Sequence, residues 1–415
     1  MRRAAALLTA ALVAGCSARE HANPFDPENP STGGRPAGFV ALAGTGLVEL
    51  RWTSPAIEGD FQFQLFRRIQ GESEFQALGS RLPGSTTSYF DFGLTNGLLH
   101  EYRLYYVFSG QPGGLPADDA GTPGPLRPWC ADLSRRTLIE STPDGRHVLT
   151  ETGGFLGPTF VAVDSTQGAV WVSDTYDGQV VVINPTSPGS RRVFQDLTEP
   201  VAIALDPIDQ SAWVCDQGRN ALYHFPPASV PGTGTRISDV LKPIGVACDP
   251  GDGTVWVCER GRDQVRRFSR TGTPLTATPL AAPSRVAVDS LNGDAWVTSL
   301  DGARVVRFSA AGAAQDTVPL AGPVGIAVDA RRGRIWVADT RLGQVIALRR
   351  SGQVEFTVRG LPLALEVAVD LATGEAWATV SGLQAIVRIS PGGAVLRTLG
   401  GLSDPYGIAL DPGRR

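Results

Sequence analysis

The chain has 415 residues, of which 42% are hydrophobic and 19% charged, a composition typical of folded domains and too apolar for a disordered chain. The formal net charge of −4 gives no electrostatic support for nucleic-acid binding, so no nucleic-acid partner is expected. Glycine and proline number 49 and 31, and such frequent turns between short apolar runs favour β-structure.

Residues 1–15 are predicted to be a secretory leader, because two arginines precede an apolar run too short to span a membrane as a mature helix. The run ends in LVAGC, which resembles the bacterial lipobox. The resemblance implies cleavage before Cys16 and a diacylglyceryl cysteine at the new N-terminus, which would anchor the protein to a membrane. Ser17 favours the outer membrane or cell surface over inner-membrane retention. The alternative is an ordinary secretory signal followed by an incidental cysteine.

Residues 16–35 are predicted to form a flexible linker that starts at the lipidated Cys16. The stretch is rich in Pro, Asn, Gly and Ser and shows no hydrophobic periodicity, so it is not expected to bury a core. Its segment NPFDPENP resembles the stretch that follows the lipidated cysteine in many bacterial surface lipoproteins.

Residues 36–127 alternate apolar and polar residues between turn signals, as in LVELRW and EYRLYYV, which predicts an antiparallel β-sandwich. The region resembles a fibronectin type III domain in Leu50 and Trp52, in the stretch TSYFDFGL, and in Tyr102 and Tyr105. The resemblance implies that Trp52 is the core tryptophan and that one late tyrosine ties a strand corner through its hydroxyl. A spacer is the preferred role, and an adhesive module is the alternative.

A tryptophan-centred strand then recurs, as in AVWVSDT and RIWVADT. The tryptophans lie 40–43 residues apart and are Trp129, Trp171, Trp213, Trp256, Trp296, Trp336 and Trp377. Aspartates that end small-apolar runs such as FVAVD have the same period and are Asp164, Asp206, Asp249, Asp289, Asp329, Asp370 and Asp411. Periods near forty residues, built of short strands, indicate the blades of a β-propeller. The tryptophan is too large to lie near the axis and is expected to fill the space between blades.

Each repeat is predicted to contain four strands, with the xVAVD run innermost and the WV run second. The region opens at Trp129 with an incomplete blade and ends on a solitary innermost strand, PYGIALD. The C-terminal strand is therefore expected to complete the first blade and close the ring, which removes exposed sheet edges. We predict an all-β chain with a seven-bladed β-propeller over residues 128–415, and six blades are the alternative if the opening fragment does not join.

The repeats resemble the NHL and YVTN propeller group, whose blades carry a P-x-G-[IV]-A-[VL]-D strand followed by W/Y-V-x-D. PVGIAVD at 323–329 and IWVAD at 335–339 match this pattern closely. Departures are Ser299 and Val380, where the pattern has Asp, and LALEVAVD at 363–370, which lacks the Pro. The resemblance implies the fold, but the group includes both binders and enzymes, so it does not assign a function.

Acidic residues that follow the second strand of five repeats are the first candidates for ligand binding. In propeller geometry the end of this strand meets the start of the innermost strand on one face, at the channel mouth. The candidates are Asp132, Asp174, Asp216, Glu259 and Asp339. The alternative is a shared structural role, because an aspartate at a strand end can hydrogen-bond the backbone of its own turn.

A second candidate set breaks the repeat. The position four residues before the repeated aspartate is mostly Gly, Ala or Phe, but two repeats have Arg285 and Glu366 there. These charged side chains, with Tyr406, are expected to project over the channel mouth and contact a ligand. The alternative is a mutual or surface ion pair, which would contribute little to stability.

The sequence assigns no catalytic residue. Propellers that resemble peptide-amidating lyases use several zinc-binding histidines, whereas this region has His147 and His224. The Glu, Asn and Asp set of calcium-dependent lactonases cannot be assembled, and neither a G-x-S-x-G motif nor a phosphate loop is present. No metal or other cofactor is predicted, and binding is favoured over catalysis.

The remaining cysteines suggest packing rather than chemistry. Cys215 and Cys258 share one position in adjacent repeats, where other repeats have small residues. A secreted location permits a disulfide, and the pairs considered join Cys258 to Cys215 or to Cys248.

The sequence therefore predicts a lipoprotein of the bacterial cell envelope, anchored in the outer membrane or at the cell surface. Its propeller is expected to be a binding scaffold for a protein, peptide or glycan. The alternatives are a hydrolase or lyase that uses a metal at the channel mouth, and a structural module of a larger envelope assembly.

Overall fold

The computed structural model describes residues 21, 23–56, 60–164, 166–185, 191–225 and 234–412. The predicted leader and the predicted lipidation site Cys16 lie outside these residues. The chain divides into two compact units, Met1–Pro125 and Leu126–Arg415, called here the N-terminal unit and the ring unit. Among the described residues, no helix has the length and hydrophobicity needed to cross a bilayer.

The N-terminal unit consists of two antiparallel sheets around one core. The first sheet contains β1 (Val40–Gly44), β2 (Leu47–Arg51) and β5 (Ser88–Phe92), and the second contains β4 (Gln76–Pro83), β3 (Gln62–Ile69), β6 (His100–Phe108) and β7 (Gln111–Gly121), each in this order. Side chains of both sheets, such as Leu50 and Phe63, belong to one buried cluster. Trp52 follows β2 directly, and its ring centroid lies 5.4 Å from that of Phe63, so it is a core residue as expected.

The Tyr102 hydroxyl ties the two sheets of this unit together. It donates a hydrogen bond of 2.9 Å to Asp91 Oδ2 on β5. Arg67 of β3 donates to the same carboxylate at 2.9 Å. The tyrosine tie expected from the sequence therefore runs to a buried side chain of the opposite sheet.

The linker predicted for residues 16–35 ends earlier than expected, because the described residues 23–35 are folded into consecutive turns. The side-chain oxygens of Asn23, Asp26 and Asn29 each accept a backbone N–H two residues ahead, at 3.0, 2.9 and 2.8 Å. Such Asx turns give the backbone local partners where no helix or sheet is available. The Asn and Asp residues that suggested flexibility are thus the groups that order the segment.

Phe25 attaches this segment to the core of the N-terminal unit. Its ring centroid lies 4.5 Å from those of Tyr106 and Phe108, in edge contacts, and 5.4 Å from that of Phe61. Edge-to-face pairs of this kind add to the gain from burying the ring. A segment that cannot form a core of its own is therefore held by its neighbour's core.

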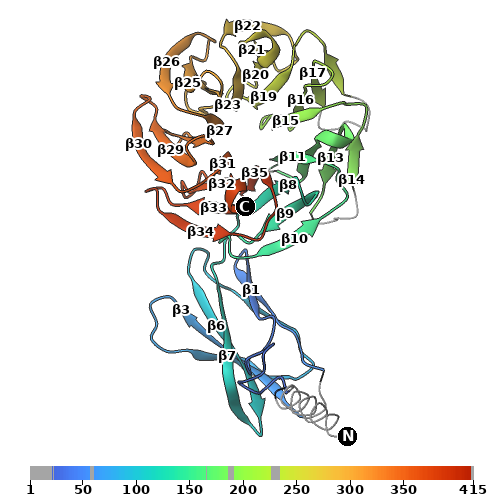
Figure 1. Cartoon of the computed structure of the whole chain (residues 1–415), viewed down its shortest axis with the longest axis vertical. Coiled ribbons are helices and arrows are strands. Elements are labelled where there is room, and N and C mark those ends of the chain that lie inside the picture. Colours follow the sequence, from blue (N-terminus) through green and yellow to red (C-terminus); the bar gives the residue numbers. More distant parts are fainter. Residues whose placement is uncertain are drawn as a thin grey trace, which may run out of the picture. The chain divides into compact units, whose positions relative to one another are not determined.

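In the ring unit, the described residues form seven four-stranded antiparallel sheets around one axis (Figure 1). Three of the sheets are β11 (Pro158–Val163), β12 (Val170–Asp174), β13 (Gln179–Ile183) and β14 (Arg191–Phe194); β15 (Pro200–Leu205), β16 (Ala212–Asp216), β17 (Ala221–Phe225) and β18 (Thr235–Ile237); and β19 (Pro243–Cys248), β20 (Val255–Glu259), β21 (Gln264–Phe268) and β22 (Pro274–Pro279). Three more are β23 (Pro283–Val288), β24 (Ala295–Ser299), β25 (Arg304–Phe308) and β26 (Ala314–Pro319); β27 (Pro323–Asp329), β28 (Arg334–Asp339), β29 (Gln344–Arg349) and β30 (Val354–Arg359); and β31 (Ala364–Val369), β32 (Ala376–Val380), β33 (Ala385–Ile389) and β34 (Val395–Leu399).

The remaining sheet joins the two ends of the ring unit. It contains β10 (Val148–Thr152), β9 (Thr137–Ser141), β8 (Arg127–Asp132) and β35 (Pro405–Asp411), in this order. β35 pairs antiparallel with β8, with Ala409 opposite Trp129, which is the pairing that the complementary ends predicted. The innermost strands β11, β15, β19, β23, β27, β31 and β35 each contact the next, and β35 contacts β11. The ring is therefore continuous.

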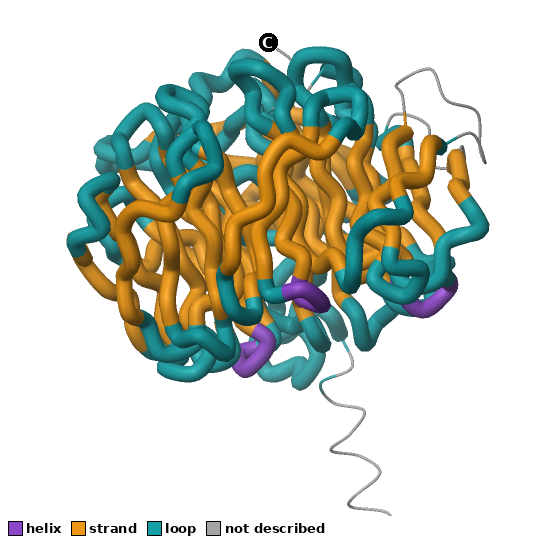
Figure 2. Tube along the Cα trace, turned by 90° about the horizontal axis from the view of Figure 1, so that it is seen from above, coloured by secondary structure: helices purple, strands orange, loops and turns teal. Residues whose placement is uncertain are grey.

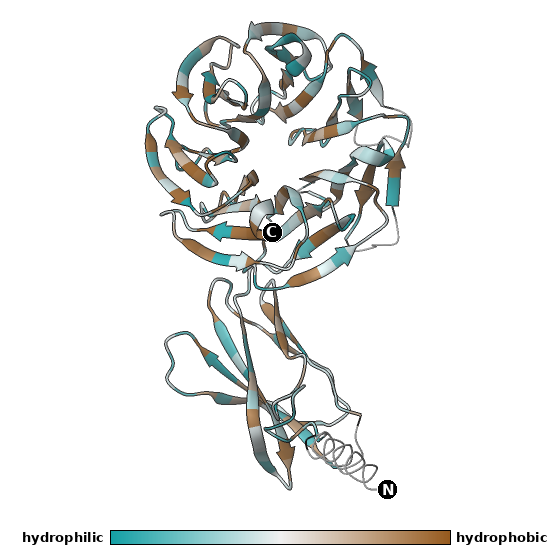
Figure 3. Cartoon of the chain, in the orientation of Figure 1, coloured by the Kyte–Doolittle hydropathy of each residue, from teal (hydrophilic) through white to brown (hydrophobic). Residues whose placement is uncertain are grey.

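The repeated tryptophans fill the joints between neighbouring sheets, as predicted. Trp296 of β24 is fully buried against Ile335 and Ile346 of the next sheet. The other tryptophans belong to equivalent clusters with the following sheet, and these are Trp129, Trp171, Trp213, Trp256, Trp336 and Trp377. Figure 3 shows the hydrophobic residues lying mainly on the strands and the loops more hydrophilic.

The two faces of the ring carry different turns. We call the face where the innermost strands begin the mouth face; the second strand of each sheet ends there, as in the pairing of Pro323 with Asp339. The short helices η1 (Thr175–Asp177), η2 (Arg260–Arg262) and η3 (Ser381–Leu383) follow second strands on this face (Figure 2). On the opposite face the repeated aspartates order tight turns, as where Asp164 Oδ1 accepts the N–H of Thr166 at 2.8 Å.

The four described cysteines, Cys130, Cys215, Cys248 and Cys258, are free thiols, so the disulfide considered from the sequence is not formed among them. Burial raises the pKa of the Cys258 thiol to about 12 and holds it protonated at neutral pH.

Candidate ligand site at the axis

One position of the innermost strand determines what lies on the axis of the ring. It is four residues before the repeated aspartate and is occupied in turn by Phe160, Ala202, Gly245, Arg285, Gly325, Glu366 and Gly407. The glycines let neighbouring strands approach closely, because a Cβ on Gly325 would lie 2.6 Å from the Cα of Glu366. Arg285 and Glu366 occupy strands on either side of Gly325 in the ring.

Arg285 and Glu366 form a buried ion pair across this gap. Arg285 Nε lies 2.7 Å from Glu366 Oε1, and the side chains are only 12% and 11% exposed. Arg285 Nη1 also donates to the carbonyl oxygen of Ile244, on a strand in the opposite direction around the ring, at 3.0 Å. The guanidinium therefore bridges three innermost strands. The two side chains therefore pair with each other and do not project freely over the mouth. This is the mutual ion pair that the sequence analysis gave as the alternative to ligand contact.

Two threonines of the second strands hold the backbone of this pair. The Oγ1 of Thr298 accepts the N–H of Arg285 at 3.0 Å and donates to the carbonyl of Val324 at 2.8 Å. Thr379 accepts the N–H of Glu366 at 3.0 Å and donates to the carbonyl of the next innermost strand at 2.7 Å. Each threonine thus fixes a charged residue and joins two strands.

Aromatic rings form another wall of the site. The Cζ of Arg285 lies 4.3 Å from the ring centroid of Phe160, a cation–π contact with β11. Tyr406 of β35 packs its ring on Phe160 at 6.3 Å between centroids. The predicted candidates Arg285, Glu366 and Tyr406 are therefore brought together with Phe160, a residue that the sequence treated as a member of the ordinary pattern.

A cavity of about 160 Å³ lies beside the ion pair and is lined by Phe160, Arg285 and Glu366. Its remaining lining comes largely from a collar of β-branched residues, one from each innermost strand: Val161, Ile203, Val246, Val286, Ile326, Val367 and Ile408. The collar lies one residue further along each strand than the charged position, away from the mouth face. It lines the cavity with apolar side chains on the side of the polar pair away from the mouth face.

This environment changes the ionisation of all three polar residues. Burial raises the pKa of Glu366, and Arg285 offsets only part of the effect. Burial is the largest single influence on Arg285 and disfavours its charge, but the attractions of Glu366, Tyr406 and Cys258 together outweigh it, so the pKa of Arg285 lies above the ordinary value. Burial also raises the pKa of Tyr406, so its hydroxyl remains a donor.

The pair does not use all of its hydrogen-bonding capacity. Within the described part of the chain, Arg285 Nη2 and Glu366 Oε2 have no hydrogen-bond partner, and neither has the Tyr406 hydroxyl. The site therefore offers donors and one acceptor close together, with a net charge near zero.

The five candidate acids lie elsewhere on the mouth face and are turned inward. Asp132, Asp174, Asp216, Glu259 and Asp339 are fully buried and are not among the residues that line the axial cavity. Each accepts at least one backbone N–H of a neighbouring turn. The contacts come from Ser403 to Asp132 at 2.7 Å, Gly157 to Asp174 at 2.6 Å, Thr198 to Asp216 at 2.9 Å, Leu241 to Glu259 at 2.5 Å and Leu342 to Asp339 at 3.2 Å.

These contacts match the alternative that the acids have a shared structural role and hydrogen-bond the backbone of turns. Four of the five carboxylates connect their own strand to the turn that enters the same sheet from the preceding one, so they brace the joints between repeats. Ser299 replaces the acid in its repeat. Its hydroxyl donates to the carbonyl of Ala281 at 2.7 Å and so makes a single hydrogen bond to the turn that enters the same sheet. Among the described residues no group of three or more potential metal ligands is present.

A signal for the missed supporting residues was present in the sequence. Thr298 and Thr379 occur in the two repeats that carry Arg285 and Glu366. The same two repeats have lost the acidic residue, at Ser299 and Val380. Three departures from the pattern therefore coincide in each of two repeats, which identifies them as specialised.

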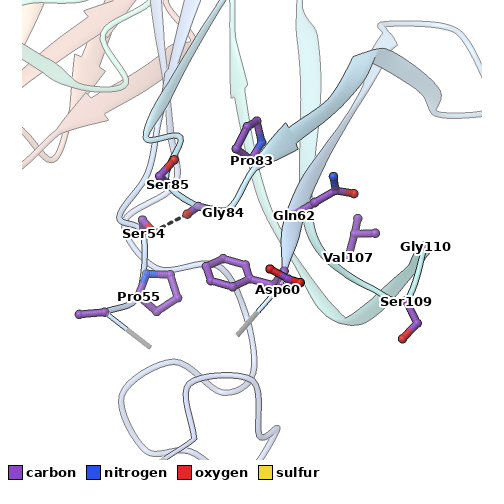
Figure 4. A pocket seen from close by; sticks show the side chains of 12 residues that line it. Ser54, Pro55, Asp60, Gln62, Pro83, Gly84, Ser85, Val107, Ser109 and Gly110 are labelled. Atoms are coloured by element: carbon purple, nitrogen blue, oxygen red, sulfur yellow. Dashed lines mark hydrogen bonds between the residues drawn. The ribbon is translucent and has the colours of Figure 1, made fainter. Parts of the chain in front are cut away.

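The N-terminal unit has a larger hollow of its own. A cavity of about 940 Å³ is lined by residues that include Pro55, Asp60, Phe61, Gln62 and Ser109. Figure 4 shows Pro55, Asp60, Gln62 and Ser109 around it, with the Ser54 hydroxyl donating a hydrogen bond to the carbonyl of Gly84. No sequence motif pointed to this hollow.

No protein-family model matches the chain, and no curated protein is detectably similar to it. Solved structures share its fold. The virginiamycin B lyase of Staphylococcus aureus is 16% identical with a TM-score of 0.54, over 68% of this chain and 92% of that one. A catalytically inactive form of that lyase with quinupristin is 16% identical with a TM-score of 0.55, over 69% of this chain and 96% of that one.

A functionally unknown protein from Desulfotomaculum acetoxidans is also similar, at 16% identity and a TM-score of 0.58, over 68% of this chain and 98% of that one. At such identity the likeness shows the fold and not the activity. The chain is therefore an all-β protein that contains a β-propeller built of repeats.

Proposed function

We propose that this protein is a lipoprotein of the bacterial cell envelope whose propeller binds a protein, peptide or glycan at the axial site. In this proposal Cys16 carries the lipid, residues 36–127 form a fibronectin type III-like spacer, and residues 128–415 form a seven-bladed propeller of the NHL/YVTN type. The seven sheets of the ring unit and the two sheets of the N-terminal unit support this architecture.

The observation that carries the binding role is the Arg285–Glu366 pair. Removing two charges from water costs several kcal/mol per ion, and apolar residues of similar volume commonly serve stability as well or better. The other innermost strands use Gly, Ala or Phe at this position, so closing the ring does not require a charge. A costly pair that lines a cavity, in repeats modified to support it, fits recognition better than scaffolding.

The free groups of the site suggest what it recognises. Arg285 Nη2 and the Tyr406 hydroxyl can donate, and Glu366 Oε2 can accept, while the pair as a whole is neutral. A group that both accepts and donates, such as a carboxamide or adjacent sugar hydroxyls, matches this set. The small cavity admits such a group as the tip of a larger protein, peptide or glycan.

Photo-crosslinking in intact envelopes tests this role, with a photoreactive residue in place of Tyr406. We expect a discrete crosslinked product that disappears in the double variant Arg285→Met and Glu366→Leu. The matched control is Arg388→Met with Glu375→Leu, which removes another short Arg–Glu pair, at 2.8 Å and similarly buried, that does not line the axial cavity. A product that persists in the axial variant would contradict binding at this site.

The lipid anchor is tested separately by metabolic labelling with a fatty-acid probe. We expect label in the wild type and none in Cys16→Ser. Absence of label from the wild type would remove the anchor from the proposal but not the axial site. The alternative of a metal-using hydrolase or lyase predicts a stoichiometric, tightly held metal ion, which elemental analysis of purified protein would detect.

A further inference from the structure

The folded part of the chain begins closer to Cys16 than the composition suggests. His21 Nδ1 lies 2.8 Å from Asp26 Oδ2, and the Asx turns and Phe25 then attach the segment to the core of the N-terminal unit. His21 is five positions along the chain from Cys16, with four residues between them, and an extended chain of that length spans at most about 18 Å. A linker that ran to residue 35 would reach about 65 Å.

Phe25 lies at one particular end of the N-terminal unit. Its ring packs on Phe61, which directly precedes β3, and on Phe108, the last residue of β6. We call this region, where β3 begins and β4 and β6 end, the near end. At the far end, Ile69 of β3 lies opposite His100, from which β6 begins. The length of β3, 8 residues, separates the two ends by about 25 Å.

The hollow of the N-terminal unit lies at the near end. Its lining comes from the residues before β3, after β4 and after β6, and it includes Phe61, which Phe25 contacts. Asp60, Gln62, Ser85 and Ser109 supply a carboxylate, an amide and hydroxyls to its wall (Figure 4), and Phe61 supplies an aromatic ring. A wall that mixes polar groups with an aromatic ring suits the layer of lipid headgroups, where one side is apolar and the other wet.

We propose that the near end rests on the lipid surface, with its hollow open to the headgroups. This inference rests on the lipid anchor at Cys16 in the proposed function. An anchored cysteine lies at the membrane interface, and about 18 Å of chain cannot lift the near end far beyond the headgroup region, which is roughly 5–7 Å thick on each side. The N-terminal unit then contacts the membrane with its near end, and its last strand, β7, ends at Gly121 at the far end.

Fluorescence quenching in vesicles tests this placement. The acylated full-length protein is bound to phosphatidylcholine vesicles that contain a lipid with a spin-labelled headgroup. A fluorescent residue replaces Gln111 at the near end or Thr95 at the far end. We expect quenching at residue 111 to exceed that at residue 95 at least threefold. Equal quenching at both positions with full vesicle binding would overturn this inference and leave the anchor intact, whereas absence of vesicle binding would overturn both.

Two variants establish that the folded segment sets the distance. Phe25→Ser removes the ring that attaches the segment, and we expect quenching at residue 111 to fall towards the level at residue 95 without loss of vesicle binding. Phe90→Ser, which replaces a phenylalanine that is 46% exposed, is the matched control and should change nothing. An inserted flexible segment of twenty residues after Ser17 should reproduce the effect of Phe25→Ser, and unchanged quenching with that insertion would contradict the proposal.

Discussion

The joints between sheets and the axis of the ring are built from the same repeats by opposite rules. Every joint uses the same residue types, a buried tryptophan and, in most repeats, a buried acid that accepts backbone N–H groups. The axis is built from differences, because one position holds Phe, Ala, Gly, Arg or Glu depending on the repeat. In a repeat protein, a residue type that recurs in every repeat indicates a packing role that all repeats share. A residue that departs from the repeat pattern indicates a role specific to its own repeat.

The largest expected effect comes from removing the closing strand. Deletion of the chain from Pro405 onward leaves one edge of β8 without a partner strand and exposes the flanks of β31 and β11. We expect the ring unit to lose its cooperative thermal transition and become sensitive to protease. The reason is that the sheets then form an open array with exposed edges, and the two end sheets no longer hold each other in place. Calorimetry and limited proteolysis measure this. An unchanged transition would show that the joints do not need closure.

Loss of one joint should cost less than loss of closure. Trp296→Ala leaves a cavity between two sheets and is expected to destabilise the ring unit by about 3–5 kcal/mol. Chemical denaturation followed by fluorescence measures the difference. Leu291→Ala, at a side chain that is 66% exposed, serves as the control and should change stability by less than about 0.5 kcal/mol.

At the axis, single and double changes should behave differently. Glu366→Leu leaves Arg285 buried without its partner and is expected to cost about 3–5 kcal/mol. Arg285→Met combined with Glu366→Leu removes both charges and should be close to neutral for stability. Equal losses in the single and double variants would mean that the pair acts as a structural joint, and the contrast between the two regions would fail.

The buried acids provide a sharper test of the same contrast. Asp216→Ala leaves the N–H groups of Thr198 and Glu199 without an acceptor and should cost about 1–3 kcal/mol. Asp216→Asn keeps one acceptor oxygen and should cost less. If the alanine variant instead kept its stability and lost the crosslinked product, this acid would belong with the ligand site.

The smallest expected effect is a pH dependence of the joint at Trp213. His224 stacks on this indole at 4.2 Å between centroids, and burial lowers the pKa of the imidazole. A lowered folded-state pKa means that the stability contribution is present above the unfolded value near 6.5 and is lost as pH falls below it. His224→Phe should therefore reduce the drop in melting temperature between pH 7 and pH 5. A variant with the wild-type drop would show that the histidine does not couple to folding.

Parts of the fold that depend on local repetition could be predicted from the sequence. The period of the tryptophans and the complementary ends anticipated both the joints and the pairing of β35 with β8. The Asn and Asp residues at 23–29 led to the prediction of a flexible linker. The same side chains that favour disorder in isolation stabilise turns once Phe25 is held by a neighbouring core.

What the sequence alone determined is the all-β repeat architecture, since short-range patterning repeats often enough to be unambiguous. Which charged residues meet depended on the tertiary structure. Arg285 and Glu366 are 81 residues apart, and they come into contact because ring closure brings distant innermost strands to one axis. The inward turn of four of the five acids was decided in the same way, since their partners include backbone N–H groups that other turns supply only once the sheets are assembled.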